Sequence, residues 1–191
     1  MNSVFSDSLK ITNRGERVNE FVERAILTND FNPLRFKLYG PMSKMIARRL
    51  VVENSLYFEE RTVANDIWFS ITSGFYAQKV IADRTMIYCL TVRKGSLELF
   101  VNKERCDERL AAAFRINDFL KGRGLLRYRF NVCVFLKFYS NFGLVVLLSR
   151  FMCICQHYQG AYLLFMEDLL ECFLKLFRKR KAGFKHVIGK N

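Results

Sequence analysis

The sequence predicts an α+β fold in a single compact domain over residues 1–191. Apolar residues make up 51% of the chain, with only two Pro and ten Gly, so a core forms without disulfides or metal. The hydrophobic spacing changes along the chain from the period of helices to that of strands and back. The expected order is N-terminal helices, a central β-meander or hairpin, a helix, a second strand pair and a C-terminal amphipathic helix. A soft boundary is expected near 122–124, and a loose tail over 182–191.

Two helices are expected near the N-terminus. Residues 16–28 place Val18, Phe21, Val22 and Ile26 on one face, which is helical spacing. The stretch from Thr28 to Pro33 then breaks the chain. A second helix is expected to begin at Pro41, because proline suits the first helical turn.

The middle of the chain is expected to be β-structure. Residues 66–73 are predicted as a strand, and residues 85–103 alternate like a β-hairpin that turns at Lys94-Gly95. Residues 104–121 return to helical spacing, and Gly122 and Gly124 end that helix.

The last part is predicted as two strands and a helix. Residues 125–139 alternate polar and apolar side chains, which indicates a strand with one polar face. Residues 143–158 are either its partner strand or a buried helix, because a continuous apolar run fits both. Residues 161–181 are predicted as an amphipathic helix, with acidic side chains early and basic ones late, as the helix dipole favours.

Charge is spread unevenly along the chain. Residues 1–118 hold 18 basic and 15 acidic side chains, a net charge of +3, whereas residues 119–191 hold 13 and 3, a net charge of +10. A basic back half of this kind indicates an anionic partner, either a nucleic acid or an anionic membrane surface, although it also serves solubility.

Basic side chains alternate with aromatic ones just after residue 122. On a strand, Arg127 and Arg129 would project from one face about 7 Å apart, a spacing similar to that of successive phosphates. Tyr128 and Phe130 are the candidates for stacking on single-stranded bases. The candidate phosphate-binding residues are Arg123, Arg127, Arg129, Arg178, Lys179, Arg180, Lys181 and Lys185, with Arg48 and Arg49 as a second tier.

The leading hypothesis is therefore a non-enzymatic protein that grips the RNA backbone without reading sequence. The alternative is a peripheral membrane or matrix-type protein that binds anionic lipid through 161–185. The basic run also fits a nuclear-import patch. The high apolar content predicts a homodimer or higher oligomer. No transmembrane helix is expected, since the longest uncharged run, 151–166, is short and contains polar side chains.

No cofactor, metal or catalytic site is expected. None of the common nucleotide-binding, metalloprotease or hydrolase motifs occurs. The weak metal candidates are Cys153, Cys155 and His157, which would share one face of a strand, with Cys172 and His186 downstream. None of the six Cys forms a CxxC pair, which favours a reducing compartment, the cytosol or the nucleus.

Two resemblances point toward RNA. The predicted element order over 41–120 resembles the double-stranded-RNA-binding domain, in which a Lys-rich motif opens the last helix. In NKERCDERLAAAF (102–114), Lys103, Arg105 and Arg109 stand at that place, interrupted by acidic residues.

In size, charge and composition, the whole chain resembles the 22-kDa RNA-silencing suppressors of criniviruses. That resemblance implies a viral protein that binds double-stranded or small RNA and so denies the host silencing machinery its substrate.

Overall fold

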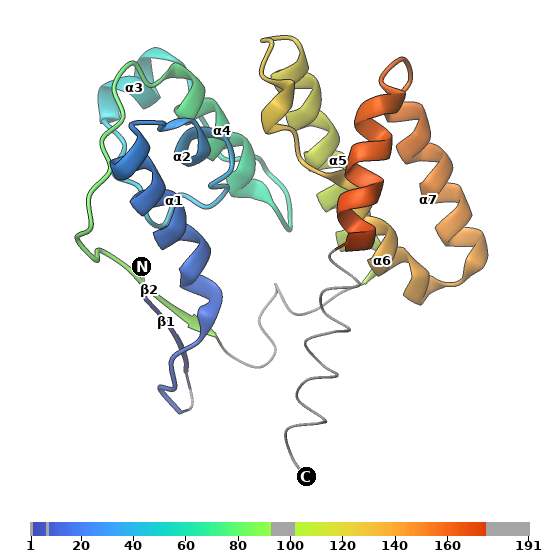
Figure 1. The fold of residues 1–191 in the computed structure, drawn as a ribbon, viewed down its shortest axis with the longest axis horizontal. Coiled ribbons are helices and arrows are strands. Elements are labelled where there is room, and N and C mark those ends of the chain that lie inside the picture. Colours follow the sequence, from blue (N-terminus) through green and yellow to red (C-terminus); the bar gives the residue numbers. More distant parts are fainter. Residues whose placement is uncertain (1, 7, 93–101, 175–191) are drawn as a thin grey trace. The chain divides into compact units, whose positions relative to one another are not determined.

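The computed structural model describes residues 2–6, 8–92 and 102–174 (Figure 1). Helices dominate these residues, and a small two-stranded parallel sheet accompanies them, which confirms the α+β class. The chain divides into two compact units, Met1–Arg129 and Phe130–Asn191, each described here by itself. The division between them falls shortly after the soft boundary expected near 122–124.

The first unit holds both strands and five α-helices among its described residues. The strands are β1 (Asn2–Phe5) and β2 (Cys89–Val92), and short 3-10 turns occupy Asn13–Gly15 and Leu126–Tyr128. The helices are α1 (Glu16–Thr28), α2 (Asn32–Phe36), α3 (Arg48–Glu53), α4 (Asn65–Tyr76) and α5 (Lys103–Lys121).

The first strand of the hairpin expected over 85–103 is present in part as β2, which pairs with a strand that the sequence did not indicate. β2 pairs in parallel with β1, with Ser3 opposite Leu90. The buried Ser3 hydroxyl donates to Thr12 O at 2.7 Å and accepts from the Gly15 amide at 3.1 Å, which fastens β1 to the turn before α1. Residues 93–101, including the expected turn, lie outside the described residues.

The N-terminal helices agree with the sequence in part. α1 has the predicted bounds and ends at Asn29, whose φ of 54° lies in the left-handed region. The helix expected to begin at Pro41 begins only at Arg48, as α3, because Pro41 starts a turn in which its carbonyl accepts from the Lys44 amide at 2.9 Å. Pro33, in the first turn of α2, takes the role expected of Pro41.

The strand expected over 66–73 is also wrong, because these residues lie within α4. Five consecutive residues, 69–73, are buried, so neither a helical nor a strand period shows in the sequence. α4 packs closely on α2, since a Cβ placed on Gly74 would lie 2.5 Å from Arg35 O. Only glycine fits at this contact.

The core of the first unit lies where α2, α4, α5 and the turn at 126–128 meet. Its buried members are Phe36, Ile71, Ile116, Leu120 and Tyr128. α5 begins at Lys103, one residue before the predicted helix, and the side chain of Asn102 caps it by accepting from the Arg105 amide at 2.9 Å. This core determines where the end of α5 and the following turn lie.

The second unit is helical throughout its described regular structure. It contains 3-10 turns at Val132–Phe135 and Ser140–Phe142, then α6 (Leu136–Tyr139) and α7 (Leu144–His157). A further helix covers 162–174, which matches the beginning of the helix predicted over 161–181. The second strand pair is therefore wrong. The alternative for 143–158, a buried helix, is correct as a helix but wrong in its burial, because Ile154 is the one buried residue of α7. Its apolar character on all sides hid its period.

Within 2–6, 8–92 and 102–174, no helix combines the length and the apolar character needed to cross a membrane.

Candidate nucleic-acid interface

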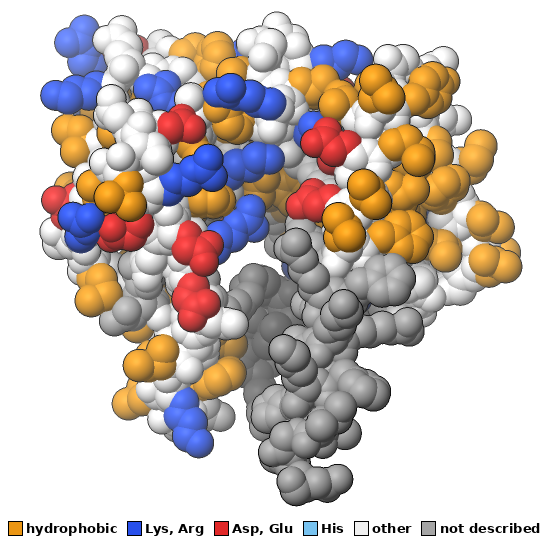
Figure 2. Space-filling view, in the orientation of Figure 1, with side chains coloured by type: hydrophobic (Ala, Val, Ile, Leu, Met, Phe, Trp, Pro, Cys, Tyr) orange, Lys and Arg blue, Asp and Glu red, His pale blue; other side chains and the backbone are white. Residues whose placement is uncertain are grey.

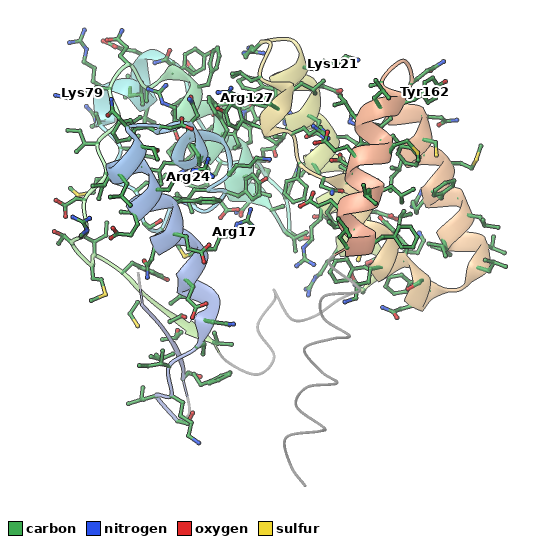
Figure 3. The ribbon with its side chains drawn as sticks, viewed as in Figure 1. Arg17, Arg24, Lys79, Lys121, Arg127 and Tyr162 are labelled. Carbon is green, nitrogen blue, oxygen red and sulfur yellow. The ribbon has the colours of Figure 1, made fainter. Side chains whose placement is uncertain are left out.

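Three cationic residues follow one another closely along the chain where α5 ends. Lys121 is the last residue of α5, Arg123 follows in the loop, and Arg127 lies in the 3-10 turn at 126–128 (Figure 3). All three are exposed. We call Lys121, Arg123 and Arg127 the basic turn. It replaces the flat strand face that the sequence predicted.

The backbone of the basic turn is fixed by hydrogen bonds that end α5. The Leu125 amide donates to Leu120 O at 2.9 Å and the Gly124 amide to Lys121 O at 3.2 Å. This is a Schellman motif, which requires a left-handed residue, and Gly124 supplies it with a φ of 68°. Leu120 and Leu125 both contribute to the core, so the turn is anchored on its inner side.

Aromatic rings support both arginines of the basic turn. The Arg123 guanidinium lies 3.7 Å from the centroid of Phe119 and 5.0 Å from that of Phe75, and it donates to Phe119 O at 3.2 Å. The Arg127 guanidinium lies 4.5 Å from the Tyr128 centroid and donates to the Tyr128 hydroxyl. A guanidinium has five N–H donors, so most donors of both groups remain for a ligand.

Few carboxylates lie near the basic turn in the sequence, and the one that precedes it most closely is the exposed Asp118 on α5. Residues 119–166 contain no Asp or Glu, and among the described residues none of the three cations forms an ion pair. The exposed Arg17 and Arg24 differ, because Glu16, Glu20 and Glu23 share α1 with them. Within the described residues, the three cations of the basic turn thus carry positive charge that no ion pair neutralises.

Two of the residues expected around this surface are buried. Tyr128 is 7% exposed and its ring packs 5.1 Å from Phe36, so it is not open to stack on a base. Arg129 is 9% exposed and its carbonyl accepts from Lys37 Nζ at 3.0 Å. The polar and apolar alternation at 126–130 reflects a 3-10 turn against a core, not a strand with a free polar face.

The remaining candidates lie elsewhere. Phe130 belongs to the second unit, where it is half-buried and stacks on Phe135 with centroids 6.1 Å apart. Arg48 and Arg49 are exposed on α3, and Arg49 Nε pairs with Glu53 Oε1 at 2.6 Å. The C-terminal candidates lie outside the described residues: Arg178, Lys179, Arg180, Lys181 and Lys185.

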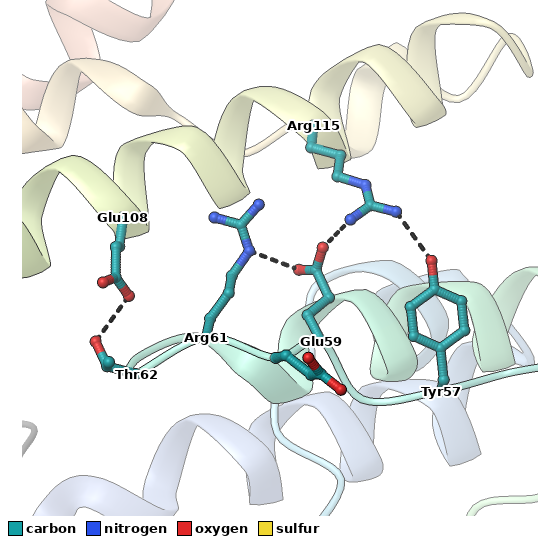
Figure 4. Close-up of a pocket in the computed structure, with 7 residues that line it drawn as sticks. Tyr57, Glu59, Arg61, Thr62, Glu108 and Arg115 are labelled. Carbon is teal, nitrogen blue, oxygen red and sulfur yellow. Dashed lines mark hydrogen bonds and ion pairs between the residues drawn. The ribbon is translucent and has the colours of Figure 1, made fainter.

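Arg115 on α5 has a structural role that sequence reasoning missed. A shallow depression of about 500 Å³ lies beside α5 (Figure 4). Within it, the buried Glu59 carboxylate accepts from Arg115 and pairs with Arg61 Nε at 3.4 Å. Glu108 accepts from the Thr62 hydroxyl at 2.8 Å. These contacts, which we call the clamp, tie the segment before α4 to α5.

A second internal cation lies near α4. Lys44 Nζ donates to Leu38 O at 2.8 Å and to Ser70 Oγ at 2.9 Å. Burial lowers the pKa of Lys44 to about 8, against the smaller opposing effect of the Asp66 carboxylate. Lys44 therefore serves the fold and is not part of a surface for anions.

The weak metal candidates do not form a site. Cys153, Cys155 and His157 lie on a helix, α7, where a spacing of two residues turns Cys155 away from the other two. The strand geometry that would have joined them is wrong. In the described ranges, no group of three or more His, Cys, Asp or Glu side chains is placed to hold a metal ion. His186 lies outside those ranges.

Comparison of the chain with protein-family models, curated proteins and solved structures gives no match. Its function is therefore inferred from its own residues.

Proposed function

We propose that the protein is a non-enzymatic RNA-binding protein that contacts the phosphate backbone without reading sequence. The observation that carries the proposal is the basic turn, three exposed cations in a stretch of 48 residues, 119–166, without a carboxylate. The basic sequence from Lys175 to Lys185 adds a second set of cations that follows along the chain. Charge of this kind binds nucleic acid by releasing counterions.

The support under Arg123 and Arg127 favours phosphate as the ligand. Rings on one side hold each guanidinium, which reduces the side-chain entropy lost on binding. The unused N–H donors form the planar fork that suits a phosphate's oxygens. Lys121 adds a point charge on the same turn.

The same contacts favour a duplex over a single strand. Single-strand binding needs open aromatic rings on which bases stack. In the basic turn, Tyr128 is buried and Arg123 covers Phe119. The choice of RNA over DNA rests on the resemblance to silencing suppressors, and sequestration of small duplex RNA is the role that we propose with it.

The test is a mobility-shift titration at several salt concentrations. The probes are a duplex RNA of ~21 base pairs, the single strand and a duplex DNA, short enough that few proteins bind each. We expect the duplex RNA to bind, with an affinity that falls linearly in log[salt]. Equal affinity for duplex DNA would remove the RNA assignment, and no binding to any probe would overturn the proposal.

A charge-matched pair of variants locates the site. Lys121→Ala with Arg123→Ala and Arg127→Ala removes three cations from the basic turn, whereas Arg17→Ala with Arg24→Ala and Lys79→Ala removes three exposed cations elsewhere in the first unit (Figure 3). We expect the first variant to weaken binding about 10–100-fold and to lower the salt slope by about 2–3. The second should change both much less. Equal losses would show that net charge, not this turn, binds RNA.

A further inference from the structure

The second unit presents an apolar surface on its two longest helices. Apolar side chains gather over α7 and 162–174 (Figure 2). Ten of them are at least half exposed: Leu144, Val145, Leu148 and Met152 on α7, and Tyr162, Leu163, Met166, Leu170, Phe173 and Leu174 on the helix that follows. Single exposed apolar residues are ordinary on proteins, but a contiguous set marks an interaction site.

These ten residues are separate from the core of the second unit. The inner sides of the two helices meet through Phe151, Tyr158 and Phe165, whose rings lie 6.1 Å and 5.4 Å apart in the pairs Phe151–Phe165 and Tyr158–Phe165. The Tyr158 hydroxyl also donates to the buried Asp168 carboxylate. The helices are thus already packed on their inner sides, and the exposed residues lie on the others.

The spacing of the exposed residues indicates another helix as the occupant. In 162–174, Leu163, Met166, Leu170 and Phe173 follow one another at intervals of three, four and three residues. We call these four residues the outer seam. Alternation of three and four is the heptad pattern by which helices interlock with helices. On α7, Val145, Leu148 and Met152 repeat it at three and four.

The apolar area suits a dimer. Fully burying one apolar side chain of this kind removes about 60–120 Å² of apolar surface from water. Ten such side chains, each half exposed or more, therefore offer on the order of 600 Å². A stable interface buries about 800 Å² on each partner, of which roughly 60% is apolar. The surface supplies that apolar share by itself.

The charges beside the outer seam disfavour an anionic membrane as the occupant of this helix. Helices that lie on such membranes carry Lys and Arg on their polar face. In 162–174 the charged residues are Glu167, Asp168 and Glu171, and both glutamates are exposed. The basic sequence begins only at Lys175.

We propose that the outer seam binds the same helix of a second copy of this chain. Such an interface is self-complementary, so one patch serves both partners in a closed dimer. The helices of the two copies would interlock as pairs of a bundle, with α7 extending the apolar contact. The proposal is independent of RNA binding, because the seam contains no residue of the basic turn.

The test is the oligomeric state of the full chain without RNA, by gel filtration with light scattering at micromolar concentration. We expect the wild type to be a dimer. The double variant Leu163→Glu with Leu170→Glu should raise the dissociation constant of the dimer more than tenfold, so that this variant is a monomer. The matched control is Leu27→Glu with Ile81→Glu, two equally exposed residues of the first unit, which should leave the dimer intact. Circular dichroism checks that each variant folds.

A milder pair, Leu163→Ala with Leu170→Ala, keeps helix propensity and should weaken the dimer less, which guards against misfolding of the glutamate pair. A monomeric wild type, or a dimer that the seam variants leave unchanged, would overturn the proposal. A monomeric wild type that sediments with phosphatidylserine vesicles would assign the surface to lipid instead.

Discussion

Two regions of the first unit use cationic side chains in opposite ways. In the clamp, Arg115 and Arg61 share the buried carboxylate of Glu59. In the basic turn, Arg123 and Arg127 have aromatic and backbone or hydroxyl partners but no ion pair among the described residues. Both regions involve α5 or the residues just after it.

The comparison is close because Arg115 and Arg123 rest on the same aromatic cluster. The Arg115 guanidinium lies 3.9 Å from Trp68, Trp68 packs 5.2 Å from Phe119, and Phe119 supports Arg123. The difference is the carboxylate that Arg115 has and Arg123 lacks. An arginine on an aromatic support stabilises the fold when a buried acid neutralises it, and remains available to an external anion when none does.

The largest expected effect is the loss of the clamp. In Glu59→Gln, the guanidinium groups of Arg61 and Arg115 lose their shared counterion, so we expect unfolding to become easier by about 2–4 kcal/mol in urea titrations. The control is Glu53→Gln, which breaks the exposed pair with Arg49 and should cost less than about 0.5 kcal/mol. Similar costs for the two variants would show that the clamp adds nothing to stability.

The next effect concerns Lys44, the other internal cation. Because its pKa falls to about 8 in the folded state from 10.5, the folded chain releases this proton at lower pH than the unfolded chain. Stability should therefore rise with pH between about 8 and 10.5, by about 1–3 kcal/mol relative to Lys44→Met. Urea titrations across this range measure the difference. If the stability of the wild type and of Lys44→Met changed with pH in the same way, Lys44 would not be the group that titrates.

The sequence predicted α1 and α5, missed α4, and left α7 open between a strand and a helix. α1 and α5 each show one apolar stripe against polar faces, so their bounds agree with the prediction to within one residue. α4 and α7 are apolar on several sides, and their runs fit strands equally well. The partner of a strand depends on residues far away in the chain, so local periodicity did not predict that β2 pairs with β1.

The candidate site was predictable in its charge but not in its geometry. Arg123 and Arg127 stood out because basic and aromatic residues alternate there, within a strongly basic part of the chain. The burial of Tyr128 followed from a core formed with Phe36, and the contact of Arg129 with Lys37 likewise joins segments far apart in the chain. The clamp was invisible for the same reason, since Glu59 and Arg115 are 56 residues apart.

A smaller effect is expected from changing Gly124, whose backbone conformation holds the basic turn. Gly124→Ala forces a Cβ into the left-handed region at φ 68° and should cost about 1–2 kcal/mol. Gly122→Ala, two residues earlier, has a helical φ of −62° and should be neutral or slightly stabilising. Thermal unfolding of the two variants measures the difference. Equal midpoints would show that the motif does not require glycine at 124.

The smallest effect separates the two arginines of the comparison. Arg123→Ala should weaken binding of the duplex RNA about fivefold at 0.15 M salt and lower the salt slope by about 1, because one phosphate contact is lost. Arg115→Ala removes the same charge from the same helical region, yet should change RNA affinity less than twofold and instead reduce stability. RNA titrations and urea unfolding of both variants give two RNA affinities and two free energies of unfolding to compare. The contrary result is that Arg115→Ala weakens RNA binding as much as Arg123→Ala while both proteins stay folded. In that case the ion pair with Glu59 would not keep Arg115 from binding RNA, and the basic turn would not differ from the clamp in RNA binding.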